Sequence, residues 1–231
     1  MTASPVAPAR DDAELLPPWP RVAAIGVFLA VAVGIGCAFV ARSDLWLDEA
    51  LSVSIARLPL GSLTDALRHD GAPPLYYALL HIWTAVLGTS DLAVRSLSAV
   101  CYLGSLVAVW FVGRRLGGRE VGALAVVVFA TSPYALRYAT EARMYALVML
   151  LVTVGILVFW RAWESPTPVR LVAFGAIVAL ALYTQYWCIY LVGTVGLLLI
   201  GACWRDRSAI APRRLLLATV IGGCAFVPWL P

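Results

Sequence analysis

Long apolar runs dominate this sequence and constrain its fold more than any other feature. A helix needs about 20 apolar residues to cross a bilayer. Candidate spans lie at 22–41, 92–113, 120–137, 143–161, 170–185, 187–204 and 214–230. Hydrophobic residues make up 62% of the chain and charged residues only 13%, whereas soluble domains are about 25% charged. A monomer of this length cannot bury so much apolar surface. The sequence therefore predicts an all-α polytopic transmembrane bundle of about seven spans.

The arginines indicate how the spans are connected. One further apolar run, 73–88, has about 16 residues, starts with two prolines and contains a histidine, so it is short for a span. The later arginine-rich stretches are 114–119, 161–170 and 205–214. If 73–88 does not cross, all of them share a side with the N-terminal arginines, which is the positive-inside pattern. We therefore predict a partly buried or interfacial helix at 73–88, a cytoplasmic N-terminus and a long outer loop at 42–91.

The rest of the chain adds little chemistry. Residues 1–21 are rich in proline and alanine, which predicts a disordered cytoplasmic tail ahead of one transmembrane core at 22–231. The five cysteines fall inside apolar runs, with no metal-ligand spacing. The arginines lie at helix ends rather than in one patch, so we expect no nucleic-acid partner. The first outer loop is too long for a plain connector, and the helical apolar spacing at 49–58 and 60–68 predicts helices at the membrane surface. That loop is the predicted site.

Two acids, Asp48 and Glu49, directly follow the first span. Paired acids at a membrane surface can act as a general base, bind a divalent cation such as Mg²⁺ or Mn²⁺, or both. The alternative is that Asp48 only caps a helix beginning at Glu49, whose charge suits the first turn.

A second motif joins His69 and Asp70 to Tyr76 through Gly-Ala-Pro-Pro. Glycine and two prolines predict a turn that presents the histidine and the aspartate on one side and the tyrosines on the other. The motif is either part of a substrate site or an ordinary interfacial turn with aromatic anchors.

A third motif, at the outer ends of the third and fourth spans, carries Arg137, Glu141 and Arg143. Charges this close to the membrane are costly unless they are paired or solvated. They could form the rim of a cavity that holds a phosphate with arginines, with Glu141 as a second metal-binding acid. The alternative is a surface ion pair between Arg137 and Glu141, four residues apart. Arg95 fits snorkelling to lipid headgroups slightly better than a place in that cavity.

In order and spacing, the motifs LWLDEA, HDGAPPLYY and SPYALRYATEARMYAL resemble the GT-C superfamily of membrane glycosyltransferases. The similarity covers roughly 40–165 and is closest to the RgtA/B/C/D-like and protein-mannosyltransferase-like branch. The resemblance implies a polyprenyl-phosphate-linked sugar donor, a lipid, glycan or protein acceptor on the outer face, and inversion by single displacement. It assigns the general base to Asp48 and the adjacent acid to Glu49. The family's second acidic motif falls near Glu141, where this chain reads Glu-Ala-Arg rather than Asp-x-Asp.

The resemblance also implies a multi-pass plasma-membrane protein with an extracytoplasmic site. It covers a seven-span core, and family members usually carry a further C-terminal portion. We therefore expect that the chain is a fragment, that it is truncated and works with a partner supplying this portion, or that it is an inactive core. The other alternative is a non-enzymatic membrane protein, such as a lipid-carrier binding or transporter subunit. Transporters place ionisable residues near mid-membrane, whereas the acids here cluster at one face.

Overall fold

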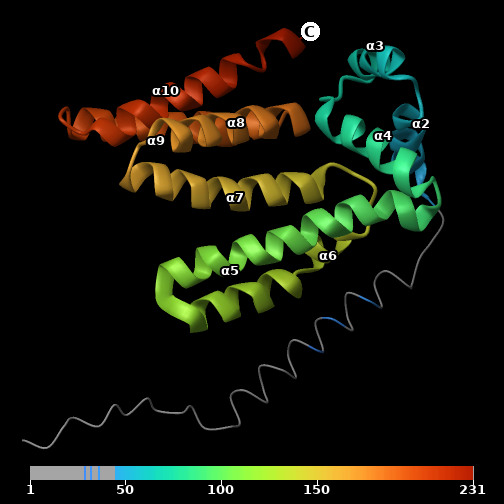
Figure 1. Cartoon of the computed structure of the whole chain (residues 1–231), viewed down its shortest axis with the longest axis horizontal. Helices are drawn as coiled ribbons and strands as arrows, with labels where there is room; N and C mark the ends of the chain where they lie inside the picture. Colours follow the sequence, from blue (N-terminus) through green and yellow to red (C-terminus); the bar gives the residue numbers. More distant parts are fainter. Residues whose placement is uncertain (1–28, 30–31, 33–35, 37–44, 231) are drawn as a thin grey trace, which may run out of the picture.

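A computed structural model describes residues 29, 32, 36 and 45–230, and all regular secondary structure in this part of the chain is helical (Figure 1). The predicted first span, 22–41, and the predicted tail therefore lie almost wholly outside the described residues. The helices are α2 (Leu47–Ala56), α3 (Leu60–Asp70), α4 (Leu75–Leu87), α5 (Asp91–Ala130), α6 (Pro133–Ala139), α7 (Tyr145–Glu164), α8 (Pro168–Thr184), α9 (Cys188–Arg205) and α10 (Ile210–Cys224), followed by a 3₁₀ turn, η1 (Val227–Trp229).

Helix α5 is a hairpin of two arms rather than one straight span (Figure 1). The break falls at Gly117 and Gly118, whose backbone angles are not helical, and the φ of +83° at Gly118 favours glycine. A Cβ added at Gly113 would come within 2.9 Å of Ala125 and of Gly122 on the returning arm. Because the arms approach this closely, the expected spans 92–113 and 120–137 lie side by side.

The returning arm of α5 ends earlier than the sequence pattern predicted. It stops at Ala130, and α6 begins at Pro133 after a short break. Proline lacks an N–H and crowds the preceding turn, so it favours the first helical position over a helix interior. The expected boundary at residue 137 was therefore wrong.

Within the described residues, four segments are long and apolar enough to cross a membrane: α5, α7, α9 and the stretch 210–229. Helix α8 is slightly shorter, with 17 residues. Helix α4 has 13 residues and spans only about 20 Å, against a bilayer core of about 30 Å. Its length agrees with the prediction that 73–88 does not cross, while the total of seven spans stays a prediction.

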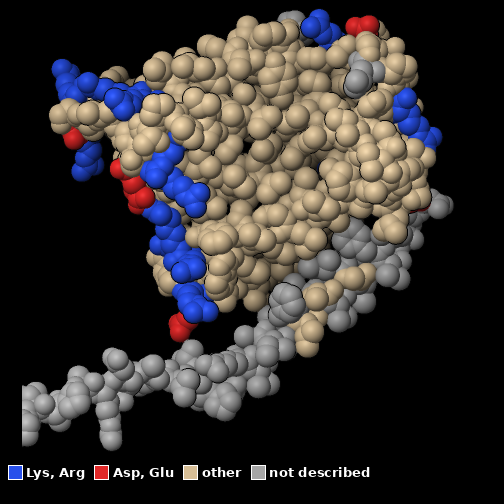
Figure 2. All heavy atoms as spheres, in the orientation of Figure 1, with Lys and Arg blue, Asp and Glu red and all other residues tan. Residues whose placement is uncertain are grey.

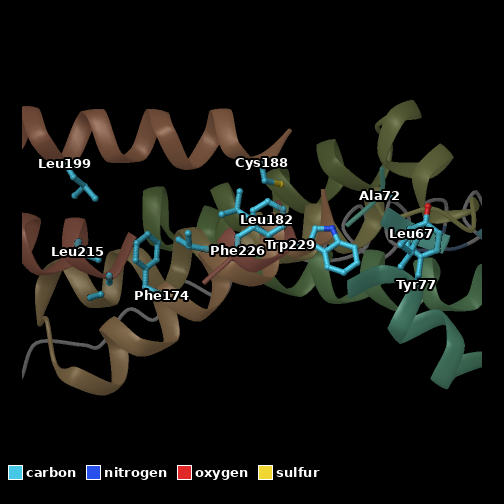
Figure 3. Packing of buried hydrophobic residues seen from close by; sticks show 14 of the residues in the cluster. Leu67, Ala72, Tyr77, Phe174, Leu182, Cys188, Leu199, Leu215, Phe226 and Trp229 are labelled. Carbon is cyan, nitrogen blue, oxygen red and sulfur yellow. The ribbon is translucent and has the colours of Figure 1, made fainter. Parts of the chain in front are cut away.

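Helices α7, α8 and α10 pack side by side, with α5 against α7 and α9 against α10. The contact between α8 and α10 is close because glycines meet there: a Cβ at Gly222 would lie 2.4 Å from the carbonyl oxygen of Gly175. Small residues let helix backbones approach in this way within membranes. A core cluster then joins Phe174, Leu182 and Phe226 of this group to Leu67 and Tyr77 of α3 and α4 (Figure 3).

The two ends of the bundle differ in charge. The α5 hairpin turn and the α7–α8 and α9–α10 connections lie together at one end, where most of the visible basic side chains gather (Figure 2). Arg115 pairs there with Glu164, and Arg214 donates to the carbonyl oxygen of Pro166. Helices α2, α3 and α4 lie at the opposite end. The three later arginine stretches therefore lie at one end. Their common side with the N-terminal arginines, which lie outside the described residues, and the side of the membrane that each end faces stay predictions.

Candidate functional site

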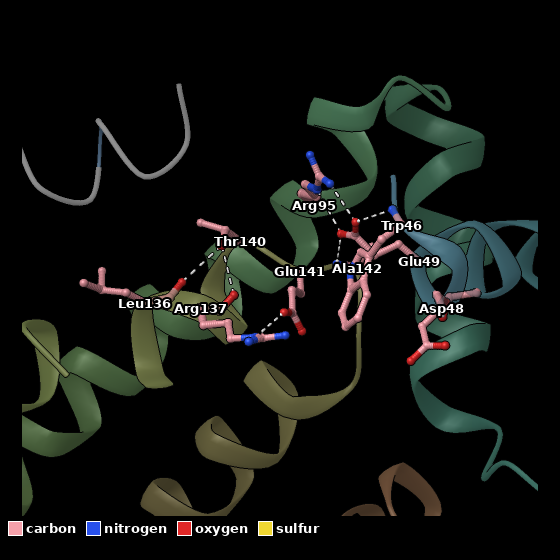
Figure 4. Close-up of polar contacts among 10 residues, drawn as sticks. Trp46, Asp48, Glu49, Arg95, Leu136, Arg137, Thr140, Glu141 and Ala142 are labelled. Carbon is pink, nitrogen blue, oxygen red and sulfur yellow. Dashed lines mark hydrogen bonds and ion pairs between the residues drawn. The ribbon is translucent and has the colours of Figure 1, made fainter. Parts of the chain in front are cut away.

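Glu49 is the centre of a buried polar network that joins three separate segments of the chain (Figure 4). None of its side chain is exposed. Its Oε1 accepts hydrogen bonds from Arg95 Nε, at 2.9 Å, and from the Ala142 amide, at 2.8 Å. Its Oε2 accepts from Arg95 Nη2, at 2.6 Å, and from the Trp46 amide, at 3.4 Å. Helix α2, the start of α5 and the α6–α7 connection therefore meet at one carboxylate.

Local helix geometry places Glu49 for this role. Helix α2 begins at Leu47 with Trp46 as its N-cap residue, so Glu49 is the third helical residue and reaches back to the N-cap amide. Burial acts to raise the pKa of Glu49, but hydrogen bonds from Arg95 and Ala142 together lower it below its ordinary value. The carboxylate therefore stays ionised although it is buried.

The network leaves Glu49 no capacity for other ligands. An ionised carboxylate has about four lone-pair sites, and the four hydrogen bonds above occupy them. Arg95 is also placed differently from the expectation for a snorkelling side chain. It is buried against Glu49 in a two-point ion pair instead of reaching toward headgroups.

Asp48 lies beside this network but outside it. Its side chain points away from Arg95 and is 48% exposed (Figure 4). Its Oδ2 lies 3.5 Å from Nη1 of Arg143, whose side chain is only 17% exposed. Since the helix already begins at Leu47, Asp48 is its second residue and not the N-cap residue. The capping alternative is therefore wrong, and Asp48 is an accessible carboxylate next to a largely buried cation.

Arg137 and Glu141 form the ion pair that the sequence offered as the plainer alternative. Arg137 Nε donates to Glu141 Oε1 at 2.7 Å, and the guanidinium stacks over the Trp46 ring at 5.6 Å. Arg137 is mostly exposed and Glu141 mostly buried. Glu141 directly precedes Ala142, so Asp48 and Glu141 each lie one residue from the hydrogen bond between Glu49 and Ala142. The first and third motifs therefore lie close together.

The second motif divides between the surface and the core. Gly71 ends α3 with a φ of +72°, which supplies the predicted turn. His69 is exposed, and the side chain of Asp70 lies outside what the structure describes. Tyr76 is buried in α4, with its hydroxyl 3.5 Å from Ser98 Oγ, and Ser98 in turn donates to the carbonyl oxygen of Arg143 at 3.3 Å. Tyr76 is therefore linked through Ser98 to the backbone of Arg143, whereas His69 lies at the surface.

Sequence reasoning missed the contribution of Arg95, Ser98 and the Ala142 amide. For Arg95, the missed signal was a charge one turn inside an apolar span, at the same end as the acids. Such a charge is costly without a partner, and the buried Glu49 is that partner. No sequence pattern marks Ser98 or a main-chain amide as a ligand, because their roles depend on contacts between distant segments.

The acids of the site do not fit a protein-held metal ion. Glu49 has no free lone pair, Glu141 is engaged by Arg137, and Asp48 faces Arg143. Within the described residues no group of three or more His, Cys, Asp or Glu side chains is placed to hold a metal. The divalent cation that the sequence suggested thus lacks a matching donor set here, and arginine is the cation that the geometry provides.

An apolar cavity of about 570 Å³ lies apart from the polar network, between α7, α8 and α9. Its walls include Leu151, Phe159, Val178 and Val195. The lining residues with a polar side-chain atom are Thr219, Trp160 and Trp163. The first lining residue on α7 is Leu151, six residues after Tyr145, where that helix begins. The lining therefore starts about 9 Å along the helix axis from the end that carries the polar site. A cavity of this size and polarity accommodates a hydrocarbon chain.

The protein has several apolar helices of membrane length, and a buried carboxylate–guanidinium network lies at one end of them. These features define a membrane protein with a polar interfacial site. Residues 71–231 match the family of dolichyl-phosphate-mannose-protein mannosyltransferases. The match covers well over half of the chain, and the chain belongs to this family of glycosyltransferases. The matched region begins after Asp48 and Glu49. The match to the family therefore does not include the first motif. No curated protein and no solved structure matches the chain.

Proposed function

We propose that the protein transfers a sugar from a polyprenyl-phosphate donor to an acceptor hydroxyl, with Asp48 as the general base. The observation that carries this proposal is the contrast between two adjacent acids. Glu49 is buried and fully hydrogen-bonded, whereas Asp48 is half exposed beside Arg143. A base must be within reach of the proton that it removes, and an anionic donor needs a nearby cation. The Asp48–Arg143 pair provides both.

The reaction follows from these two groups. Asp48 takes the proton of the acceptor hydroxyl, and the acceptor oxygen forms a bond to the anomeric carbon. The bond from that carbon to the donor's phosphate oxygen breaks on the opposite face, so the configuration inverts. The polyprenyl phosphate leaves with the electron pair, and Arg143 offsets the charge that grows on its oxygens. A positioned base contributes roughly 10²–10⁴-fold to such a step.

The apolar cavity supports a lipid-linked donor. Its walls on α7, α8 and α9 accept a hydrocarbon tail that stays in the bilayer while the phosphate reaches Arg143. None of the charged site residues lines the cavity, so head and tail of the donor would contact separate parts of the protein.

The site faces the extracytoplasmic side of the plasma membrane in this proposal. The support is the separation of the arginine-rich end from the α2–α4 end, because positive connections favour the cytoplasm. In a cysteine-free background, an impermeant thiol reagent should label Gly61→Cys from outside and leave Arg119→Cys unlabelled. The reverse pattern contradicts the orientation.

The proposal is tested by Asp48→Asn in the full-length chain, assayed for sugar transfer in proteoliposomes with labelled polyprenyl-phosphate sugars. Asparagine keeps the shape of the side chain and an oxygen for Arg143 but lacks basicity. We expect kcat to fall by about 10²–10⁴ with donor binding retained. Asp65→Asn, which removes another exposed acid of this end, is the matched control and should transfer normally.

A native rate for Asp48→Asn removes Asp48 as the base. Donor binding with no turnover in the unaltered protein favours the lipid-carrier binding alternative or an inactive core. Lipid analysis of cells with and without the gene shows which outcome applies. Loss of a transferase leads either to accumulation of the donor or to an acceptor that lacks one sugar.

A further inference from the structure

We infer that Glu49 positions Arg143 for the donor phosphate, by holding the backbone of the α6–α7 connection against α2. This inference rests on the proposed function of Arg143. Glu49 accepts from the Ala142 amide at 2.8 Å, and the residues on either side of this bond, Asp48 and Arg143, meet at 3.5 Å. Two consecutive residues of α2 are therefore matched with two consecutive residues of the connection.

The connection depends on other segments for its position. Residues 140–144 lie between α6 and α7 and are not helical. The backbone around Arg143 is held from two sides: Ser98 of α5 donates to its carbonyl oxygen, and Glu49 accepts from the preceding amide. The backbone from which the Arg143 side chain extends is thus fixed by two fully buried side chains, those of Ser98 and Glu49.

The ion pair with Arg95 keeps Glu49 in place for this task. Arg95 binds both carboxylate oxygens, at 2.9 and 2.6 Å, in a largely buried pair. The single contact between Arg143 and Asp48 is longer, at 3.5 Å, and more exposed. Arg95 is therefore the more tightly anchored cation, and Arg143 is the less buried of the two. Glu49 is therefore a positioning residue. Helix α2 carries the general base, Asp48, and also holds in place the segment that carries the phosphate-binding cation, Arg143.

Such positioning matters because a displacement of about 1 Å at a reacting centre can cost roughly 10²-fold in rate. A cation that must stabilise the departing phosphate acts best when it is already in place before the reaction. Loss of the Ala142 anchor should therefore weaken donor recognition through Arg143, even when the base Asp48 is unchanged.

The test compares two uncharged double variants in the full-length chain. Glu49→Gln with Arg95→Met keeps a side-chain oxygen for the Ala142 amide. Glu49→Met with Arg95→Met removes it. Both remove the two buried charges together, and glutamine and methionine have similar length, so the variants differ chiefly in the anchor. Each is measured for residue-resolved amide hydrogen exchange at Ala142 and for the donor KM and kcat with the same polyprenyl-phosphate sugar.

We expect exchange at Ala142 to be about tenfold faster in the Met variant than in the Gln variant, because its hydrogen bond is lost. The donor KM should be at least about tenfold higher, and kcat should fall as well, because a displaced Arg143 also stabilises the departing phosphate less well. Equal exchange in the two variants overturns the anchor itself. Faster exchange with an equal donor KM overturns the positioning of Arg143. Amide exchange can be measured without turnover. A protein that transfers no sugar therefore refutes the proposed function, while the exchange rates still show whether Glu49 anchors the Ala142 amide.

Discussion

The buried pair between Glu49 and Arg95 predicts a large and non-additive effect on stability. None of the Glu49 side chain and only 6% of the Arg95 side chain is exposed. Removing one partner of such a pair leaves an uncompensated buried charge and costs about 3–5 kcal/mol. Glu49→Gln takes the two-point ion pair away from the buried guanidinium, and Arg95→Met strands a carboxylate that still accepts from two amides. We therefore expect each single variant to lose about 3–5 kcal/mol of unfolding free energy, with Arg95→Met nearer the lower figure.

The double variant Glu49→Gln with Arg95→Met should lose much less than the sum of the two. No charge stays buried, and the glutamine oxygen still accepts from the Ala142 amide. Replacing both members of a buried pair is often close to neutral, so we expect a loss of about 2 kcal/mol or less and a coupling energy of at least about 4 kcal/mol.

Reversible unfolding in mixed micelles of mild and denaturing detergent measures all four proteins of this cycle. The pair Asp65→Asn and Arg68→Met on exposed α3 positions is the control and should show single losses below about 1 kcal/mol. Single losses of that size at Glu49 and Arg95, or losses that simply add, refute the idea that the network is buried and coupled.

The same network predicts how stability depends on pH. The pKa of Glu49 is lowered in the folded protein from an ordinary value of 4.5, so its contribution is fully present above that value. It is lost as the pH falls through the lower folded-state pKa. The acid-induced loss of unfolding free energy should therefore be smaller in Glu49→Gln than in the unaltered protein. An identical acid dependence in the two proteins contradicts this assignment.

Two further predictions concern the donor and the metal. Val195→Trp, which fills the apolar cavity from α9, should raise the KM for long-chain donors about tenfold. It should leave the KM for short-chain donors unchanged. Leu197→Trp, at an exposed position of the same helix outside the cavity, is the control and should change neither KM. An equal effect of both variants, or of Val195→Trp on short-chain donors, excludes the cavity as a tail site. Chelators should leave transfer unchanged, because no group of three or more metal-binding side chains comes together among the described residues; loss of activity that Mg²⁺ or Mn²⁺ restores refutes this expectation.

Local pattern was sufficient to predict most of the helices. The expected segments 49–58, 60–68 and 73–88 appear as α2, α3 and α4, and the later apolar runs appear as the arms of α5 and as α7 to α10. Their formation depends on features that a sequence shows directly: apolar length, helical periodicity and the positions of glycine and proline. The prediction failed at the end of the returning arm of α5, where a new helix begins at Pro133.

The candidate site was only partly predictable, and Asp48 and Glu49 show why. The sequence presents two adjacent acids of the same type, and nothing in it separates their roles. Side chains of consecutive helical residues point about 100° apart, so only the placement of α2 decides which one turns inward. The structure directs Glu49 to Arg95 and Ala142 and leaves Asp48 at the surface beside Arg143.

The sequence by itself therefore determined that this chain is a helical membrane protein, and which of its ends carries the acids, because lipid requires continuous apolar segments and leaves charges at their ends. Only the tertiary structure decided which charges are partners. The contacts of Glu49 with Arg95 and Ala142 join residues 46 and 93 positions apart. Such contacts form when whole helices pack, and whether a charge is buried or accessible depends on that packing rather than on its neighbours along the chain.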